Sequence, residues 1–71
     1  MRYAIVIEKA ENNYSAYVPD LPGCIATGKT VAETEQQMRE AIEFHLEDLT
    51  ETGAKIPPAI SRSDYVEVLA A

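Results

Sequence analysis

The chain has 71 residues and a formal net charge of −6, with 46% hydrophobic and 25% charged residues. This composition is typical of one small globular domain with a limited core, and it excludes a disordered chain. No apolar run approaches the ~18 residues of a membrane span, and no secretory signal is visible. One cysteine excludes an intramolecular disulfide or a multi-cysteine metal site. The excess of acidic residues argues against direct binding of nucleic acid by this chain alone.

Two strands are predicted at the start of the chain. Alternate residues are apolar on both faces of Arg2–Glu8, so we expect this strand to be central in a sheet. Lys9–Asn13 has the residues of a hairpin turn, and Tyr14–Val18 alternates again as the second strand.

A proline-glycine turn is predicted next. Pro22-Gly23 fits the central pair of a type II turn, because proline presets φ and glycine supplies the positive φ of the following position. Asp20 stands beside this turn, where an aspartate usually accepts hydrogen bonds from neighbouring backbone amides. Cys24–Thr27 then predicts a short third strand, which Gly28 breaks.

A long helix is predicted from Val31 to about Thr52. Thr30 and Glu33 have the spacing of a capping box at its start, and Gly53 is placed to end it in a left-handed conformation. One wide apolar stripe would cover the sheet, and it is formed by Val31, Met38, Ala41, Ile42, His45, Leu46 and Leu49.

The final predicted element is a strand over Tyr65–Ala70, after Pro57-Pro58 has excluded further helix. This strand could return to the sheet beside the first one. The predicted fold class is therefore α+β, with a three-stranded antiparallel meander, one long helix packed on the sheet and one C-terminal strand (β-β-β-α-β) in a single domain over residues 1–71.

The segment around the turn resembles the HicB-like antitoxins. The family motif runs roughly Tyr-x-x-x-Asp-Leu-Pro-Gly-Cys, followed by a glycine, a threonine and a glutamate. In this chain it is matched by Tyr17 or its neighbour, by Asp20–Cys24, and by Gly28, Thr30 and Glu33. The resemblance continues to about Pro58. It departs from the pattern at Thr34 and Glu35, where relatives often carry alanine or a second apolar residue.

The resemblance implies a truncated ribonuclease-H-like fold and a role as an antitoxin. By implication the chain would bind and block a small basic toxin of the HicA type, which is a ribonuclease that cleaves mRNA. Full-length members of the family usually append a DNA-binding domain, and we expect none in this chain, which ends at Ala71.

Three residues were considered for catalysis. Asp20 could hold a metal in a nuclease, but the strand Arg2–Glu8 supplies no companion acid at the centre of the sheet. His45 is expected to pack at the edge of the helix stripe, and Cys24 to be a small, half-buried apolar residue, because no basic neighbour in sequence would lower its pKa. We therefore expect no catalytic residue, metal or cofactor.

One side of the predicted helix carries a row of glutamates opposite the apolar stripe. Like charges at these spacings repel one another, so the row is either a solvated face or a surface for a basic partner. Phe44 projects onto the same side, where an exposed aromatic side chain favours a covered contact. The predicted partner-binding residues are Glu40, Glu43, Phe44 and Glu47.

Two classes of function remain after the sequence analysis. The first is an antitoxin-type binding protein. We expect it in the cytoplasm because no secretory signal is visible, and as a homo-oligomer because its core is small and its sheet edges are exposed. A related possibility is a HicB-like module with another protein partner or with none remaining. The second class is a small metal-dependent nuclease that would use Asp20 with helix glutamates.

Overall fold

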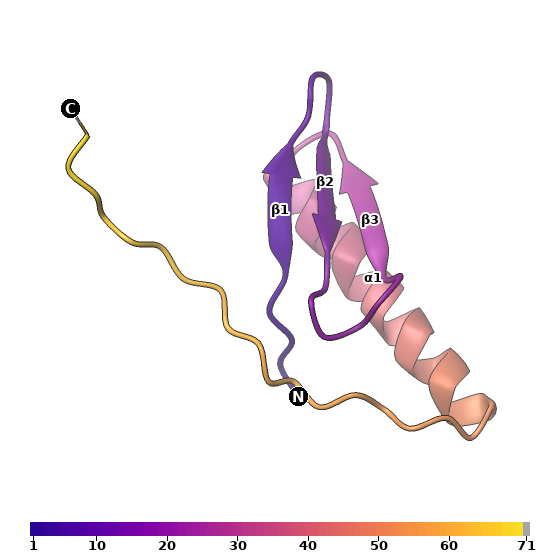
Figure 1. Cartoon of the computed structure of the whole chain (residues 1–71). Helices are drawn as coiled ribbons and strands as arrows, with labels where there is room; N and C mark the ends of the chain where they lie inside the picture. The colour runs from indigo at the N-terminus through magenta and orange to yellow at the C-terminus, as the bar shows by residue number, and fades with distance from the viewer. Residues whose placement is uncertain (71) are drawn as a thin grey trace.

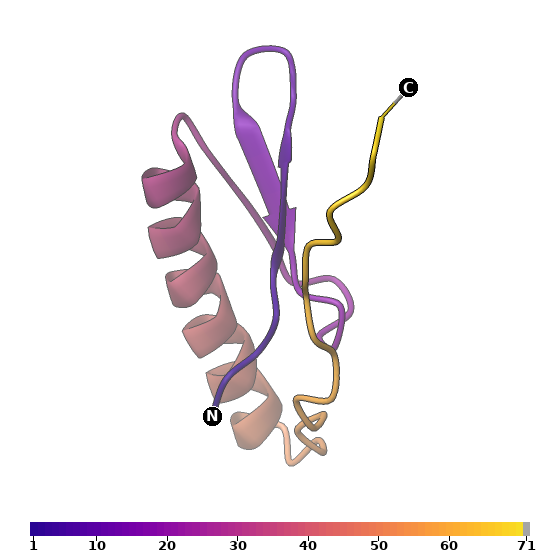
Figure 2. The same cartoon turned by 90° about the vertical axis from the view of Figure 1, so that its left-hand side faces the viewer.

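Three short strands and one helix form the computed structural model, which describes residues 1–70 (Figure 1). Strand β1 is Val6–Lys9, β2 is Tyr14–Tyr17 and β3 is Ile25–Gly28. Both pairings are antiparallel and the order in the sheet is β1-β2-β3. The helix α1, Val31–Glu51, lies across one face of the sheet, and the other face is open (Figure 2). The predicted α+β meander with one long helix is confirmed.

The core lies between α1 and the central strand. Met38 on the helix and Leu21 in the turn are completely buried. Ala16, Val18 and Cys24 complete the buried cluster, and the partly buried side chains packed against it are Tyr3, Ile5, Ile7, Ala26, Ala41, Ile42 and Leu46. The helix packs mainly on β2 and β3. The predicted stripe therefore covers only part of the sheet.

The strand register determines which backbone groups are free at the sheet edges. The amide of Ala10 donates to the carbonyl of Asn13 (2.8 Å), which closes the hairpin with a hydrogen-bonded pair. Such pairs alternate along an antiparallel ladder, so Val6 and Glu8 bond to β2, whereas Ile5 and Ile7 direct their backbone groups outward. The backbone groups of Ile5 and Ile7 therefore point away from β2 at this edge, and of these the Ile5 carbonyl accepts a hydrogen bond from the Ser63 hydroxyl.

The proline-glycine turn has the backbone of a type II turn. The amide of Cys24 donates to the carbonyl of Leu21 (3.1 Å), and Gly23 has φ +84°. That φ lies in the left-handed region, where a side chain is disfavoured. The amide of Val18 then donates to the carbonyl of Cys24 (3.2 Å), so β2 and β3 are joined directly above the turn.

The first turn of α1 is held by its cap and by its contact with β3. The Thr30 hydroxyl accepts from the Glu33 amide (3.0 Å), and the Glu33 carboxylate accepts from the Lys29 amide (3.3 Å). Thr34 is completely buried, and its hydroxyl donates to the Thr30 carbonyl (2.7 Å). Gly28 lies so close that a Cβ atom there would be 2.6–2.9 Å from atoms of Thr34. The helix and β3 can approach because residue 28 has no side chain.

The end of the helix is close to the predicted position. The amide of Thr52 donates to the carbonyl of Asp48 (3.0 Å), and the amide of Ala54 donates to that of Leu49 (2.9 Å). Gly53 follows with φ +73°, which turns the chain away from the helix axis. No helix in residues 1–70 is long and apolar enough to cross a membrane.

The C-terminal strand predicted at Tyr65–Ala70 does not form. Residues 54–70 are extended but belong to no strand, and they leave the sheet beside the start of β1 (Figures 1 and 2). A strand needs a partner backbone, and residues 65–70 have none within the chain. For the same reason the prediction that the first strand is central was wrong: β1 is an edge strand and β2 is central.

Candidate functional site

An exposed aromatic side chain on α1 borders a cleft beside β3. Phe44 is 75% exposed, and Ile25 on the neighbouring strand is 69% exposed. Both residues line a cleft of about 290 Å³, whose other lining residues are Gly23, Cys24, Ala41, His45 and Asp48. The helical members recur at three- and four-residue spacings, so they share one side of α1. Two large apolar side chains thus flank a cleft at the free edge of β3.

The helix around this cleft is acidic. Between Arg39 and Lys55 the sequence has five carboxylates and no lysine or arginine. Glu40 and Glu47 are exposed and lie about one turn to either side of Phe44. Asp48 is the carboxylate that lines the cleft, and Glu40 and Glu47 lie on the other side of Phe44. The apolar centre is therefore bordered by negative charge, which is complementary to a basic protein surface.

Glu43 lies on the other flank of α1. It borders a cavity of about 400 Å³ between the helix and the N-terminal residues, together with Met1, Arg2, Tyr3, Ile5, Glu35, Met38, Arg39, Ile42 and Leu46. Arg2 and Arg39 reduce the negative charge on this side. Of the four predicted partner-binding residues, Phe44 lines the cleft, and Glu40, Glu43 and Glu47 form one row beside it on the side away from the cleft. Their role in binding stays a prediction.

The sequence predicted that Asp20 accepts hydrogen bonds from neighbouring turn amides, and this prediction was wrong. Its carboxylate accepts hydrogen bonds from the amides of Ile60 (2.9 Å) and Ser61 (2.8 Å) and from the Ser61 hydroxyl (2.7 Å). These bonds, led by that of the Ser61 hydroxyl, hold the pKa of Asp20 below its ordinary value of 3.8. The proline-glycine turn is thereby fastened to a segment forty residues further along the chain.

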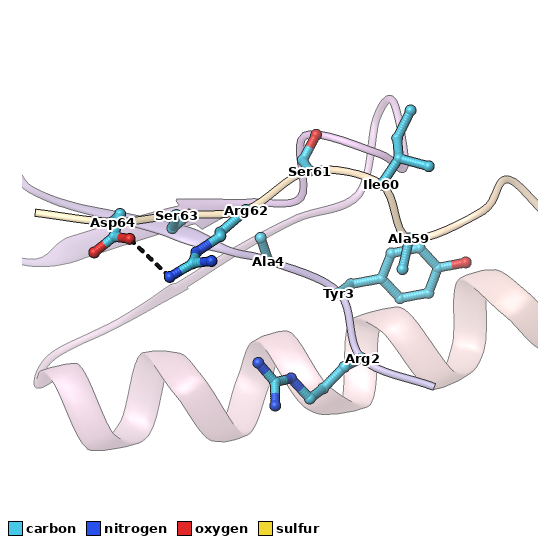
Figure 3. A pocket seen from close by; sticks show the side chains of 9 residues that line it. All are labelled: Arg2, Tyr3, Ala4, Ala59, Ile60, Ser61, Arg62, Ser63 and Asp64. Carbon is cyan, nitrogen blue, oxygen red and sulfur yellow. Dashed lines mark ion pairs between the residues drawn. The ribbon is translucent and has the colours of Figure 1, made fainter.

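A groove separates the N-terminal residues from the C-terminal segment (Figure 3). Arg2, Tyr3 and Ala4 form one wall, and residues 59–64 form the other. The Ser63 hydroxyl donates to the Ile5 carbonyl (3.2 Å), and the Tyr3 hydroxyl donates to the Pro57 carbonyl. The ion pair of Arg62 with Asp64 (3.1 Å) is exposed and contributes little. Two hydrogen bonds thus join the N-terminal residues to the C-terminal segment.

Cys24 and His45 border the cleft beside β3, but their surroundings do not activate a nucleophile. Cys24 is buried rather than half-buried, with 4% exposure, and burial raises the pKa of its thiol. A reactive cysteine needs the opposite shift. Among residues 1–70 no group of three or more histidine, cysteine and acidic side chains is arranged to hold a metal ion.

Two features of this region were missed in the sequence. Ile25 follows the turn in a short apolar run, and only the register shows that it shares the open face of the sheet with Val6 and Tyr17. Strict period-two counting from Cys24 would have indicated this exposed position. The link from Asp20 to Ser61 had no local signal, because it joins distant parts of the chain.

Comparisons with known proteins agree with this geometry. A family profile described as "HicB_like antitoxin of bacterial toxin-antitoxin system" matches residues 3–69. A 14.9 kDa protein of Haemophilus phage HP1, from the rep-hol intergenic region, is 38% identical over 66 residues, which are 93% of this chain and 50% of that protein. A UPF0150 protein of Thermoplasma acidophilum is 41% identical over 58 residues, which are 80% of this chain and 84% of the relative.

A solved structure is also similar. One chain of a "HicA3 and HicB3 toxin-antitoxin complex" superimposes with a TM-score of 0.73 at 33% identity, covering 83% of this chain and 70% of that one. The chain therefore spans about half the length of the phage protein and most of the length of the other two proteins.

Proposed function

Because the chain belongs to the HicB-like antitoxin family of bacterial toxin-antitoxin systems, we propose that it binds and neutralises a small basic toxin of the HicA type, a ribonuclease that cleaves mRNA. The observation that carries the proposal is the similarity to a chain from a toxin-antitoxin complex. Such a role needs a complementary surface and no catalytic group. It also places the protein in the cytoplasm, where such a toxin meets its mRNA.

The cleft beside β3 is the proposed contact surface. A basic ribonuclease would be steered by the carboxylates of Glu40 and Glu47 and anchored on Phe44 and Ile25. Exposed aromatic side chains of this kind are frequent hot spots of protein interfaces. Glu43, on the other flank, would contribute through its charge alone.

The test measures binding of a HicA-type toxin by surface plasmon resonance at several salt concentrations. We expect Glu40→Lys with Glu47→Lys to slow association at least tenfold and to flatten its salt dependence, since rim charges act mainly on encounter. Phe44→Ala should instead raise the dissociation rate, with a cost of about 2 kcal/mol or more.

Matched variants control for charge and for apolar exposure. Glu8→Lys with Glu11→Lys makes the same charge change at the hairpin, and Ile60→Ala removes an exposed apolar side chain elsewhere. Both should bind as the parent does. If the helix variants bind with unchanged rates, the acidic row is a solvated face and the toxin docks elsewhere.

The alternative of a metal-dependent nuclease has no observation in its favour. All the hydrogen bonds of Asp20 tie it to Ile60 and Ser61, which suits a structural role. We propose that the protein is not an enzyme and does not bind nucleic acid by itself. The same preparation, incubated with RNA and magnesium or manganese, should leave the RNA intact; cleavage that disappears in Asp20→Asn would overturn this.

A further inference from the structure

The edge of β1 has the residue pattern of a strand with neighbours on both sides. Tyr3, Ile5 and Ile7 face the helix, while Ala4 and Val6 face the open side, so both faces are apolar over residues 3–7, before the exposed Glu8 and Lys9 end the strand. Edge strands usually carry charges or proline on one face to prevent pairing. Here the outward backbone groups of Ile5 and Ile7 are accompanied by apolar side chains. The pattern fits a strand that acquires a second partner.

A groove runs along this edge on the helix side. It has a volume of about 520 Å³ and is lined by Ile5, Ile7, Lys9, Tyr14, Val31, Glu35 and Tyr65. Because α1 packs mainly on β2 and β3, the inner face of β1 is only partly covered. Another strand beside β1 would fill the groove from the edge.

The C-terminal residues have the composition of the missing strand. We call residues 65–70 the arm. Its side chains are almost fully exposed, with 100% for Tyr65 and 102% for Leu69. Val66 and Val68, at 83% and 76%, share one entirely apolar face with Ala70, whereas the other face includes Glu67. An alternating apolar segment of six residues, about 20 Å long when extended, has the usual length of a strand.

The base of the arm is fixed before the arm leaves the molecule. Asp20 holds Ile60 and Ser61, and the Ser63 hydroxyl reaches the carbonyl of Ile5. Beyond Asp64 the arm diverges from β1 in both views, toward the side of the sheet opposite the helix (Figures 1 and 2). Tyr65 thus still lines the groove beside its own β1, whereas the following residues of the arm are carried away from that edge.

We propose that the arm of one copy pairs with the β1 edge of a second copy, and that the second copy returns its own arm to the first. The exchange is symmetric, so one two-fold interface pairs the β1 edges of both copies and forms a closed dimer rather than an open filament. Val66 and Val68 enter the groove beside Ile5, Ile7 and Val31. The backbone groups of Ile7 and the amide of Ile5 find partners, while the Ile5 carbonyl keeps its bond to Ser63. This inference is independent of the proposed toxin binding.

Cross-linking between differently labelled copies tests the exchange directly. In a Cys24→Ala background, one preparation carries Lys9→Cys and another carries Val68→Cys; they are refolded together and treated with a short bis-maleimide. We expect a covalent dimer in the mixture. In the matched control, Asp48→Cys replaces Lys9→Cys; Asp48 is exposed and lies beside β3, at the opposite edge of the sheet from β1. This mixture should give at least tenfold less covalent dimer.

A chain that carries both Lys9→Cys and Val68→Cys separates the two possible pairings. Linkage within single chains, with none between copies in the mixture, would show that the arm returns to its own β1 and would overturn the proposal. Linkage between copies supports it.

Particle mass gives a second, independent test. Light scattering should give twice the chain mass for the parent and the chain mass for Val66→Asp with Val68→Asp. Asn12→Asp with Asn13→Asp adds the same charge at the exposed hairpin turn and should stay dimeric. Circular dichroism checks that each variant keeps its helix. A monomeric parent, or an arm variant that is folded and still dimeric, would contradict the exchange.

Discussion

Two glycines near the turn and the helix start are required for different physical reasons. Gly23 has φ +84° and open space around the position of a Cβ atom, so a side chain there would strain only the backbone. Gly28 has no such φ, but a Cβ atom would collide with the backbone and hydroxyl of Thr34. The first residue sets the turn, and the second allows the helix to approach the sheet.

Gly28→Ala should therefore destabilise the protein although alanine is a mild substitution. The added carbon would force β3 away from Thr34, with a cost of about 1–3 kcal/mol, because such an overpacked contact has no flexible side chain that can yield. In a domain of this size, thermal unfolding should occur about 4–8 °C lower per kcal/mol. The exposed neighbour variant Thr27→Ala is the control. An unchanged melting temperature for Gly28→Ala would show that the helix start shifts freely.

At the scale of elements, local sequence pattern predicted the helix, the turn and the strands that flank it. The strands before and after the hairpin, the turn at Pro22-Gly23 and the helix from Val31 were expected within a few residues, because alternation and capping are local signals. The strand at Tyr65–Ala70 was not found, since alternation reports a tendency to pair and does not supply the partner. The contact of Asp20 with Ser61 was missed because no sequence spacing encodes it.

The candidate contact surface was only partly predictable for the same reason. The helical wheel placed Phe44 among glutamates, and the structure has it exposed on that side. Helical spacing also puts Glu43 beside Arg39, but the cavity between this side of α1 and the N-terminal residues is visible only in the structure. The truncated ribonuclease-H-like description stays a prediction from the family resemblance.

The link between the turn and the C-terminal segment should depend on pH. Hydrogen bonds lower the folded-state pKa of Asp20, so the link is complete above the ordinary value of 3.8 and is lost as the pH falls through the lowered value. Nuclear magnetic resonance between pH 6 and pH 2 should show the amides of Ile60 and Ser61 titrating together, with a midpoint below 3.8. Asp20→Asn should abolish this titration and Asp48→Asn should leave it. A midpoint above 3.8 would contradict the bonding described.

At the scale of the whole molecule, charge is distributed unevenly. The five carboxylates between Arg39 and Lys55 occupy the C-terminal half of α1, and the last turn of the helix contains no basic residue. The C-terminal end of a helix carries a partial negative charge, so each nearby carboxylate is unfavourable by about 0.3–1 kcal/mol at low ionic strength. The repulsion among the carboxylates adds to this cost.

Salt should consequently stabilise the free protein. At fixed protein concentration, the melting temperature should rise as sodium chloride is increased from low ionic strength to about 0.15 M, where screening acts over roughly 8 Å. Glu47→Gln with Glu51→Gln should raise the melting temperature at low salt and reduce the salt response. Glu8→Gln with Glu11→Gln, at the hairpin, is the matched control. A parent melting temperature that falls with added salt would contradict this account.

The acidic half of α1 thus means that the isolated protein is electrostatically frustrated at the surface proposed for its partner. Any cation that settles there, whether a counterion or the side chain of a basic protein, relieves a repulsion already present in the fold. Part of the binding free energy would then come from the reduced repulsion among the carboxylates of α1. If a cationic partner binds at this proposed surface, its binding should also raise the thermal stability of the protein.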